Sequence, residues 1–236
     1  QGLYLMHAPE GACLRMRIAA FAWRVKNQVR PLGYQRLGLP CQLMGTGMAF
    51  PWRLVAGMAL ANAHIVEDMK LGIDLALAGH PAMFCADAVV SSFFPVASSA
   101  VKSQRKRWEH GHLSLILQEV PRLLWRAGCK ADLRLFALVL DLLVPPLALL
   151  VVLLTGMLML AAGAAALGSS TLPLEIAFVA FGLLAIAVFL AWHGWARQVV
   201  SLRDLLSVPC YVLAKVPLYF QFWTHRQKDW VRTDRN

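Results

Sequence analysis

Residues 63–80 read AHIVEDMKLGIDLALAGH, and this stretch predicts an amphipathic helix that ends near Gly79. Four apolar residues fall on one face of that helix: Val66, Met69, Ile73 and Leu77. Glu67 and Asp68 then lie in its first turn, where the positive end of the helix dipole favours carboxylates. A carboxylate kept ionised in this way can act as a base, although an ordinary acidic pair at a helix N-terminus has the same pattern.

A second stretch, residues 102–112, reads KSQRKRWEHGH and is strongly basic. Four cations fall within six residues, and an indole and two imidazoles follow them. Cations at this density suit an anionic ligand, and the guanidinium group of Arg107 offers a fork of donors to phosphate oxygens. A solvated basic face, or a contact with lipid headgroups ahead of a membrane segment, would have the same composition.

Together the two stretches resemble a known family. The match consists of Glu67-Asp68, followed by Gln104-x-x-Arg107-Trp108 and then by hydrophobic spans. This order resembles the family 2 glycosyltransferases, the inverting, nucleotide-sugar-dependent group that includes cellulose, chitin and hyaluronan synthases. The resemblance covers nearly the whole chain and is to the C-terminal portion of the bacterial exopolysaccharide and cellulose-synthase-like members.

The resemblance extends upstream to residues 43–52, LMGTGMAFPW, which are similar to the glycine-containing, acceptor-side segment of the exopolysaccharide members. It implies that Asp68 is the catalytic base that takes a proton from the acceptor hydroxyl. It also implies a substrate-binding set: Glu67, Gln104, Arg107, Trp108, Gly45, Thr46 and Gly47. A single displacement at the anomeric carbon needs one base on the acceptor side and cations where the diphosphate leaves. Trp108 adds a flat apolar face on which a sugar ring can stack.

The family also has an Asp-x-Asp pair that binds uridine diphosphate and its divalent metal, Mg²⁺ or Mn²⁺, and this sequence contains no Asp-x-Asp. Asp68 is the first aspartate, and residues 1–6 look like a strand that begins without an initiator Met. We therefore expect the C-terminal portion of a longer enzyme, with the nucleotide-binding half and the metal site upstream. No metal ligands are expected in this chain, which alone should be inactive.

The composition is that of a membrane protein, since 58% of the residues are hydrophobic and only 15% are charged. The net charge of +10 raises the question of nucleic acid. The basic residues, however, gather before and after the hydrophobic spans and form no recognisable nucleic-acid-binding motif. The charge therefore indicates phosphate binding and a cytoplasmic side, with the lipid bilayer and no nucleic acid as partners.

The first hydrophobic span is expected at about residues 133–160, with a kink at Pro145-Pro146. Asp141 would lie near its cytoplasmic end, either as a functional intramembrane carboxylate or as a group that reaches the headgroups. A second span is expected at about residues 174–196. An uncharged turn, residues 163–173, joins the two spans. This pattern predicts a hairpin with both ends in the cytoplasm and with Trp192 and Trp195 in an interfacial belt.

A third apolar stretch, residues 205–223, is interrupted by Pro209, Lys215 and Pro217 and precedes a basic tail. The positive-inside bias predicts a helix that lies in the interface or re-enters, so that the tail returns to the cytoplasm. Three residues of the tail faintly resemble the gating segment of processive synthases: Trp230, Thr233 and Arg235. A tail that serves only as a basic membrane anchor would have the same composition.

Three further patterns in the sequence concern a helix, a strand and the cysteines. Residues 12–30 predict a basic amphipathic helix, suited to the membrane surface or to packing against the upstream half. Residues 82–94 predict a strand and a loop of the cytoplasmic region. The five cysteines are widely spaced and contain no Cys-x-x-Cys, which argues against a disulfide framework and against a zinc site.

The expected fold is α/β plus membrane α. It would comprise a partial GT-A-type glycosyltransferase domain (1–130), a transmembrane helical hairpin (131–198), and an interfacial helix with a basic cytoplasmic tail (199–236). The resemblance implies a multi-pass protein of the bacterial inner membrane, facing the cytoplasm, that moves a sugar from a nucleotide-diphosphate sugar to a growing polysaccharide. Export or assembly proteins are further candidate partners. The alternatives are a transferase that adds one sugar to a polyprenyl-linked lipid acceptor, and a non-catalytic membrane scaffold or receptor of the same fold.

Overall fold

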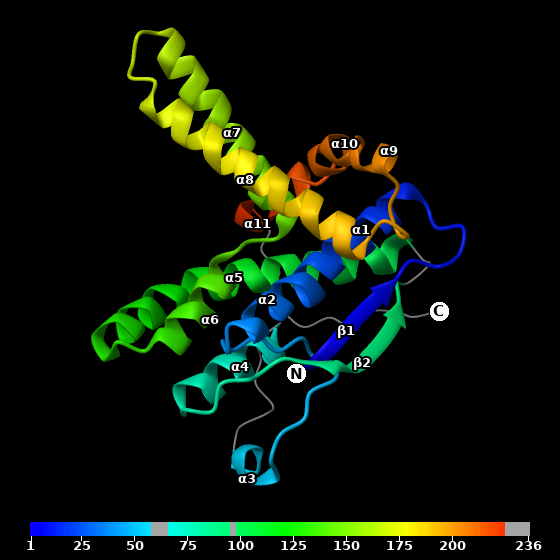
Figure 1. The fold of residues 1–236 in the computed structure, drawn as a ribbon, viewed down its shortest axis with the longest axis vertical. Helices are drawn as coiled ribbons and strands as arrows, with labels where there is room; N and C mark the ends of the chain where they lie inside the picture. Colours follow the sequence, from blue (N-terminus) through cyan, green and yellow to red (C-terminus); the bar gives the residue numbers. More distant parts are fainter. Residues whose placement is uncertain (58–65, 95–97, 225–236) are drawn as a thin grey trace.

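The computed structural model describes residues 1–57, 66–94 and 98–224, except for the side chains of residues 98–105 and 223. It is mostly helical, with one small parallel sheet and two long apolar helices (Figure 1). The strands are β1 (Gly2–His7) and β2 (Cys85–Phe93). The helices are α1 (Leu14–Arg24), the π-helix η1 (Val25–Val29), α2 (Arg30–Arg36), α3 (Trp52–Val55), α4 (Glu67–Leu77), α5 (Ser98–Lys130), α6 (Leu133–Leu143), α7 (Leu147–Ala166), α8 (Leu172–Trp195), α9 (Leu202–Leu205), α10 (Val208–Leu213) and α11 (Val216–Thr224).

The two strands run parallel, with Leu3 opposite Val89 and His7 opposite Phe93. Both agree with the sequence prediction, because residues 3–6 are an unbroken apolar run and because β-branched and aromatic side chains recur within residues 82–94. Parallel strands need a long crossover, and α1 to α4 lie in the connection between β1 and β2. Their carboxyl ends therefore meet at the same edge of the sheet.

Helix α4 has the position and the buried face that the periodicity of residues 63–80 predicts. Val66, Met69 and Ile73 are buried in one core cluster with apolar residues of α5 and α6. Beyond the helix, Gly79 has a φ of +86°, a left-handed conformation that glycine adopts without strain and that commonly ends a helix. This packing fixes the direction in which the first turn of α4, with its two carboxylates, points.

Helix α1 connects the sheet to the base of the long hairpin. On the sheet side, Ala20 packs with Met6 of β1. On the opposite side, Ile18 packs against the start of α7, and Phe21 packs against Trp192 near the end of α8. The predicted helix at residues 12–30 therefore has protein on both sides, because its apolar residues recur on more than one face.

The long helices α7 and α8 form a hairpin that projects from the body of the molecule (Figure 1). Their mean hydropathies are 2.5 and 2.6, and only 6% and 11% of their apolar windows are buried, so both are candidates to cross a bilayer. The span predicted at residues 133–160 begins too early. Residues 133–143 form the separate helix α6, which packs on α5, and Pro145 and Pro146 interrupt the chain before α7.

Trp192 is not in an interfacial belt. Its side chain is only 8% exposed and packs with Phe21 of α1. Its indole N–H donates to the carbonyl oxygen of Val200 at 2.8 Å. A buried indole needs such an acceptor, and here the bond attaches the end of α8 to the turn that follows it.

Residues 205–223 do not form one continuous helix. Pro209 and Pro217 lie in the first turns of the short helices α10 and α11, where a proline is tolerated. Tyr211 and Tyr219 pack in one cluster with Ile18 of α1. The segment therefore folds back onto the body, and in the described part of the chain only α7 and α8 are long and apolar enough to span a membrane.

Candidate functional site

The carboxylate pair and the glycine segment, predicted separately, meet in space. Gly45 lies directly against Asp68, because a Cβ added to this glycine would come within 3.0 Å of the Oδ2 atom of Asp68. Gly45 also has a φ of +75°, which glycine adopts without strain. The backbone conformation favours glycine at this position, and any side chain there would press on Asp68, so the loop limits the space around one carboxylate oxygen.

The start of β1 holds this loop in place. The backbone N–H of Gly2 donates to the carbonyl oxygen of Gly47 at 2.7 Å. The side chain of Gln1 bonds the loop twice, since Nε2 donates to the carbonyl oxygen of Thr46 at 2.7 Å and Oε1 accepts from the backbone N–H of Met44 at 2.9 Å. Thr46 is therefore positioned through its backbone, and the loop moves with the sheet.

Asp68 is half-buried, whereas the neighbouring side chain of Glu67 is exposed. Burial raises the pKa of Asp68, and this shift is opposed by the backbone N–H of Met69, which donates to Oδ1 at 2.9 Å, and by the charge of Lys26. A raised pKa makes a carboxylate a better proton acceptor, provided that it is still ionised at the working pH. The two neighbouring carboxylates thus have different environments, and Asp68 has the one that suits a base.

Lys26 is a site residue that the sequence analysis did not single out. It lies in η1, a single wide turn within a helical run, and such turns frequently occur at functional sites. Burial lowers the pKa of Lys26, and the charge of Asp68 raises it. Protein atoms surround its side chain, which nevertheless keeps accessible surface because it lines a partly open cavity. In the sequence, Lys26 is one of several basic residues in a helical pattern, and nothing local marks the wide turn.

Trp108 lies on α5 with its ring held in an aromatic cluster. Its ring centroid is 5.0 Å from that of Trp23 on α1, with an angle of 42° between the planes. Trp23 is itself fixed to the sheet, because its indole N–H donates to the carbonyl oxygen of Tyr4 at 3.0 Å. The position of the Trp108 indole is therefore set by contacts that run back to β1.

A cavity of about 200 Å³ brings Trp108 and Lys26 together, whereas Asp68 and Gly45 are not among its lining residues. It lies between α1, α5, the C-terminal short helices and the base of the hairpin, and both Trp108 and Lys26 line it. Most of its wall is aliphatic, with contributions from α7, α8 and α10. The other charged or titratable residues in the wall are Arg30, Glu109, His112, Tyr211 and Lys215.

Two ion pairs surround the cavity. Lys215 pairs with Glu109, which attaches the C-terminal segment to α5. Arg30 pairs with Asp141 of α6, and the Nε2 atom of Gln42 donates to the same carboxylate at 2.8 Å. Asp141 therefore lies on α6, outside both candidate spans, and is bonded to the body, which argues against a carboxylate within the membrane. A position near the headgroups stays a prediction.

The two histidines of the basic stretch point to separate backbone carbonyls. The Nε2 atom of His110 is 3.2 Å from the carbonyl oxygen of Leu218, and that of His112 is 2.9 Å from the carbonyl oxygen of Leu142. Burial lowers the pKa of His112 to about 3, so its ring is neutral at physiological pH. Within the described ranges, no group of three or more His, Cys, Asp or Glu residues could hold a metal ion.

The remaining predicted site residues are placed only in part. Arg107 is half-buried on α5, next to Trp108 in the chain. Gln104 is on the same helix, and its side chain is outside the described part. The three candidate gating residues lie outside the described residues: Trp230, Thr233 and Arg235.

Comparison with known proteins gives one match. The family model described as glycosyl transferase family group 2 matches residues 14–203, which is most of the chain. No curated protein and no solved structure matches. The matched region includes the glycine loop, α4, the basic stretch on α5 and both long apolar helices.

Proposed function

The chain belongs to glycosyl transferase family group 2, and on that premise we propose that it forms the acceptor-side part of a membrane-bound inverting glycosyltransferase. The donor would be a nucleotide-diphosphate sugar, and the catalytic part would face the cytoplasm of a bacterial inner membrane. The cavity is the observation that carries the proposal, because Trp108 and Lys26 line it and the charge of Lys26 also acts on Asp68. Asp68 does not line the cavity, and we place the acceptor hydroxyl between Trp108 and Asp68 on the side of Lys26.

In the proposed reaction, Asp68 removes the proton from the acceptor hydroxyl. The acceptor oxygen then forms the new bond to the anomeric carbon, and the bond from that carbon to the diphosphate oxygen breaks. The electron pair of the broken bond leaves on the diphosphate. Gly45 keeps the Oδ2 atom of Asp68 close to the loop, and Lys26 stabilises the carboxylate in the ionised form that accepts the proton.

The leaving diphosphate needs positive charge, and we assign this role to Arg107 together with the neighbouring cations of the basic stretch. The family typically depends on a divalent metal. Of the two adjacent carboxylates, Glu67 is exposed and only Asp68 faces the loop, so the described residues do not fit a metal site. The metal would be bound by an Asp-x-Asp pair outside these residues, and no step above depends on it.

The resemblance to exopolysaccharide members favours a growing polysaccharide, destined for export, as the acceptor. One observation favours a second candidate, an acceptor linked to a polyprenyl lipid. The cavity wall is mainly aliphatic and begins at the base of the hairpin, with Pro146 and Leu147 among its residues. An aliphatic wall suits a lipid chain, whereas a sugar chain is better served by aromatic and hydrogen-bonding groups.

The test is release of nucleoside diphosphate by the full-length protein in nanodiscs, with a panel of nucleotide sugars. Asp68→Asn should lower turnover by a factor of about 10²–10⁴ and leave binding of the nucleotide sugar intact, because only proton removal is lost. Asp74→Asn is the matched control, since Asp74 lies on the same helix and, within the described ranges, its one ion pair is with Lys70. Unchanged turnover in Asp68→Asn would exclude this residue as the base, and supplying an oligosaccharide or a polyprenyl phosphate separates the two acceptors.

A further inference from the structure

A second hollow lies at the carboxyl end of β1, where the turn after α8 meets α1. Its volume is about 430 Å³, within the range of about 300–1,000 Å³ that is typical of sites for small molecules. Its polar lining residues are His7, Arg17, Arg24 and Gln198. Ala8, Pro9, Ala12 and Val199 are among the apolar ones. The hollow shares no lining residue with the cavity that contains Trp108.

The two arginines make this hollow positive. Arg17 and Arg24 are seven residues apart on α1, so they lie on the same face of the helix. No acidic residue is among the described residues that line the hollow. The nearest identified countercharge is Asp204, which lies 2.9 Å from Arg17, and the Nε atom of Arg17 has no hydrogen-bond partner within the described ranges.

The positive charge of Arg24 has even fewer partners than that of Arg17 in the described part of the chain. Its Nη1 atom donates to the carbonyl oxygen of Trp195 at 3.1 Å, and no carboxylate in the described part of the chain forms an ion pair with it. Burial lowers the pKa of Arg24, which means that the surroundings stabilise its charge poorly. Because a half-buried guanidinium group retains several unused donors, an anion in the hollow would offset the cost of burying it.

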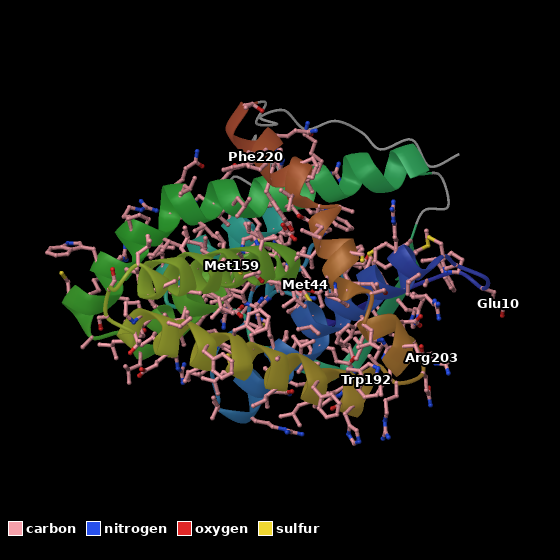
Figure 2. The ribbon with its side chains drawn as sticks, turned by 90° about the horizontal axis from the view of Figure 1, so that it is seen from above. Glu10, Met44, Met159, Trp192, Arg203 and Phe220 are labelled. Atoms are coloured by element: carbon pink, nitrogen blue, oxygen red, sulfur yellow. The ribbon has the colours of Figure 1, made fainter. Side chains whose placement is uncertain are left out.

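The position of the hollow indicates which anion. Trp195 is the last residue of the candidate span α8, and Gln198 in the wall lies within one turn beyond it. Figure 2 shows Trp192 near the end of α8 and Arg203 on α9 at the same side of the molecule, with Glu10, in the loop after β1, further out. If α7 and α8 cross the bilayer, this end of α8 is at the level of the lipid headgroups.

We propose that this hollow binds the phosphate-bearing headgroup of an anionic membrane lipid, with Arg17 and Arg24 as the phosphate ligands. The apolar side chains of Ala12 and Val199 would contact the glycerol backbone. The inference rests on the membrane-bound arrangement in the proposed function but not on catalysis. A bound lipid would fix α1 to the turn after α8, and α1 is the helix that connects the hairpin to the sheet and contains Trp23.

The test is native mass spectrometry of the full-length protein in detergent, titrated with phosphatidylglycerol or with phosphatidylcholine. We expect tighter binding of phosphatidylglycerol, and a loss of about thirtyfold in Arg17→Gln/Arg24→Gln, because each direct bond from a guanidinium group to the phosphate contributes about fivefold. Arg197→Gln/Arg203→Gln removes the same charge from exposed residues outside the hollow, where no direct bond is lost, and should change the affinity in detergent by less than about twofold. Equal losses in both double variants would overturn the proposal.

Two further arms keep the test decisive. Gln198→Trp should fill the hollow and weaken lipid binding while the ion pair of Arg17 remains, so wild-type affinity in this variant would overturn the proposal even if the arginine variants misfold. Inorganic phosphate should not displace the lipid. Displacement at comparable concentrations would mean that the hollow takes a free phosphate ligand, which also overturns it. Lipid binding is measured without turnover, so a failed transferase assay leaves this result independent.

Discussion

Replacing Gly45 with alanine tests whether the loop sets the position of Asp68. Gly45 has a φ of +75°, so an alanine there costs about 1–2 kcal/mol in backbone strain. The new Cβ would lie 3.0 Å from the Oδ2 atom of Asp68, so the carboxylate must shift by a few tenths of an ångström. Because a displacement of about 1 Å can cost about a hundredfold in rate, this smaller shift should cost about three- to tenfold.

The assay is release of nucleoside diphosphate at saturating donor, with thermal unfolding measured in the same preparation. Gly38→Ala is the matched control, since Gly38 has a φ of +67° and a Cβ there would meet no atom within 4 Å. Both variants should lower the melting temperature by similar amounts, about 2–8 °C for 1–2 kcal/mol. Only Gly45→Ala should also lower turnover.

Equal turnover in Gly45→Ala and Gly38→Ala would contradict the prediction that the loop sets the position of Asp68. That result would mean that the contact between Gly45 and Asp68 has no bearing on the reaction, and that the glycine serves only the backbone. A loss of turnover that appears in both variants would likewise assign the effect to strain rather than to the position of the carboxylate.

Three other variants test the same site. Lys26→Met removes a charge that lowers the pKa of Asp68, so the rising limb of the pH–rate profile should move to higher pH, while Lys26→Arg should leave it in place. An unmoved limb in Lys26→Met would contradict the electrostatic effect of Lys26 on Asp68. The pKa of His112 is about 3 in the folded protein, whereas that of a histidine in the unfolded chain is about 6.5. Below pH 6.5 the unfolded chain takes up a proton that the folded protein does not, so this histidine should lower the stability by about 1.4 kcal/mol for each pH unit. His112→Gln should remove this contribution to the pH dependence measured by chemical unfolding. Trp108→Ala should weaken binding of the acceptor more than binding of the donor, and equal losses would show that the indole only packs on Trp23.

Several elements could be predicted because their signals are local. Helix α4 follows from apolar residues at helical spacing and from the glycine that ends it, and both strands follow from residue type. The spans were harder to delimit. Residues 133–143 are rich in leucine and lead directly into the first candidate span, and their burial against α5 shows that they belong to the body. Trp192 was misplaced for the same reason, since an indole near the end of an apolar helix suits an interface or a core equally.

Some features of the candidate site could be predicted from the sequence, and others could not. The residue types of Asp68 and Trp108 could be chosen from the sequence because their chemistry and order resemble a family. Neither the contact of Gly45 with Asp68 nor the place of Lys26 in the cavity could be chosen, since both join segments that are distant in the chain. Such contacts depend on how α1, α4 and α5 pack on the sheet.

The sequence by itself determined the local conformations, the two long apolar helices and the chemical types in the site, because each depends on neighbours a few residues away. The tertiary structure alone decided that Asp68 lies against a glycine loop and is influenced by the charge of a lysine, and that this lysine lines the same cavity as Trp108. The physical reason is that burial and the interactions of charges arise only when the core is packed, and the order of residues in a single segment carries no record of which distant segment covers it.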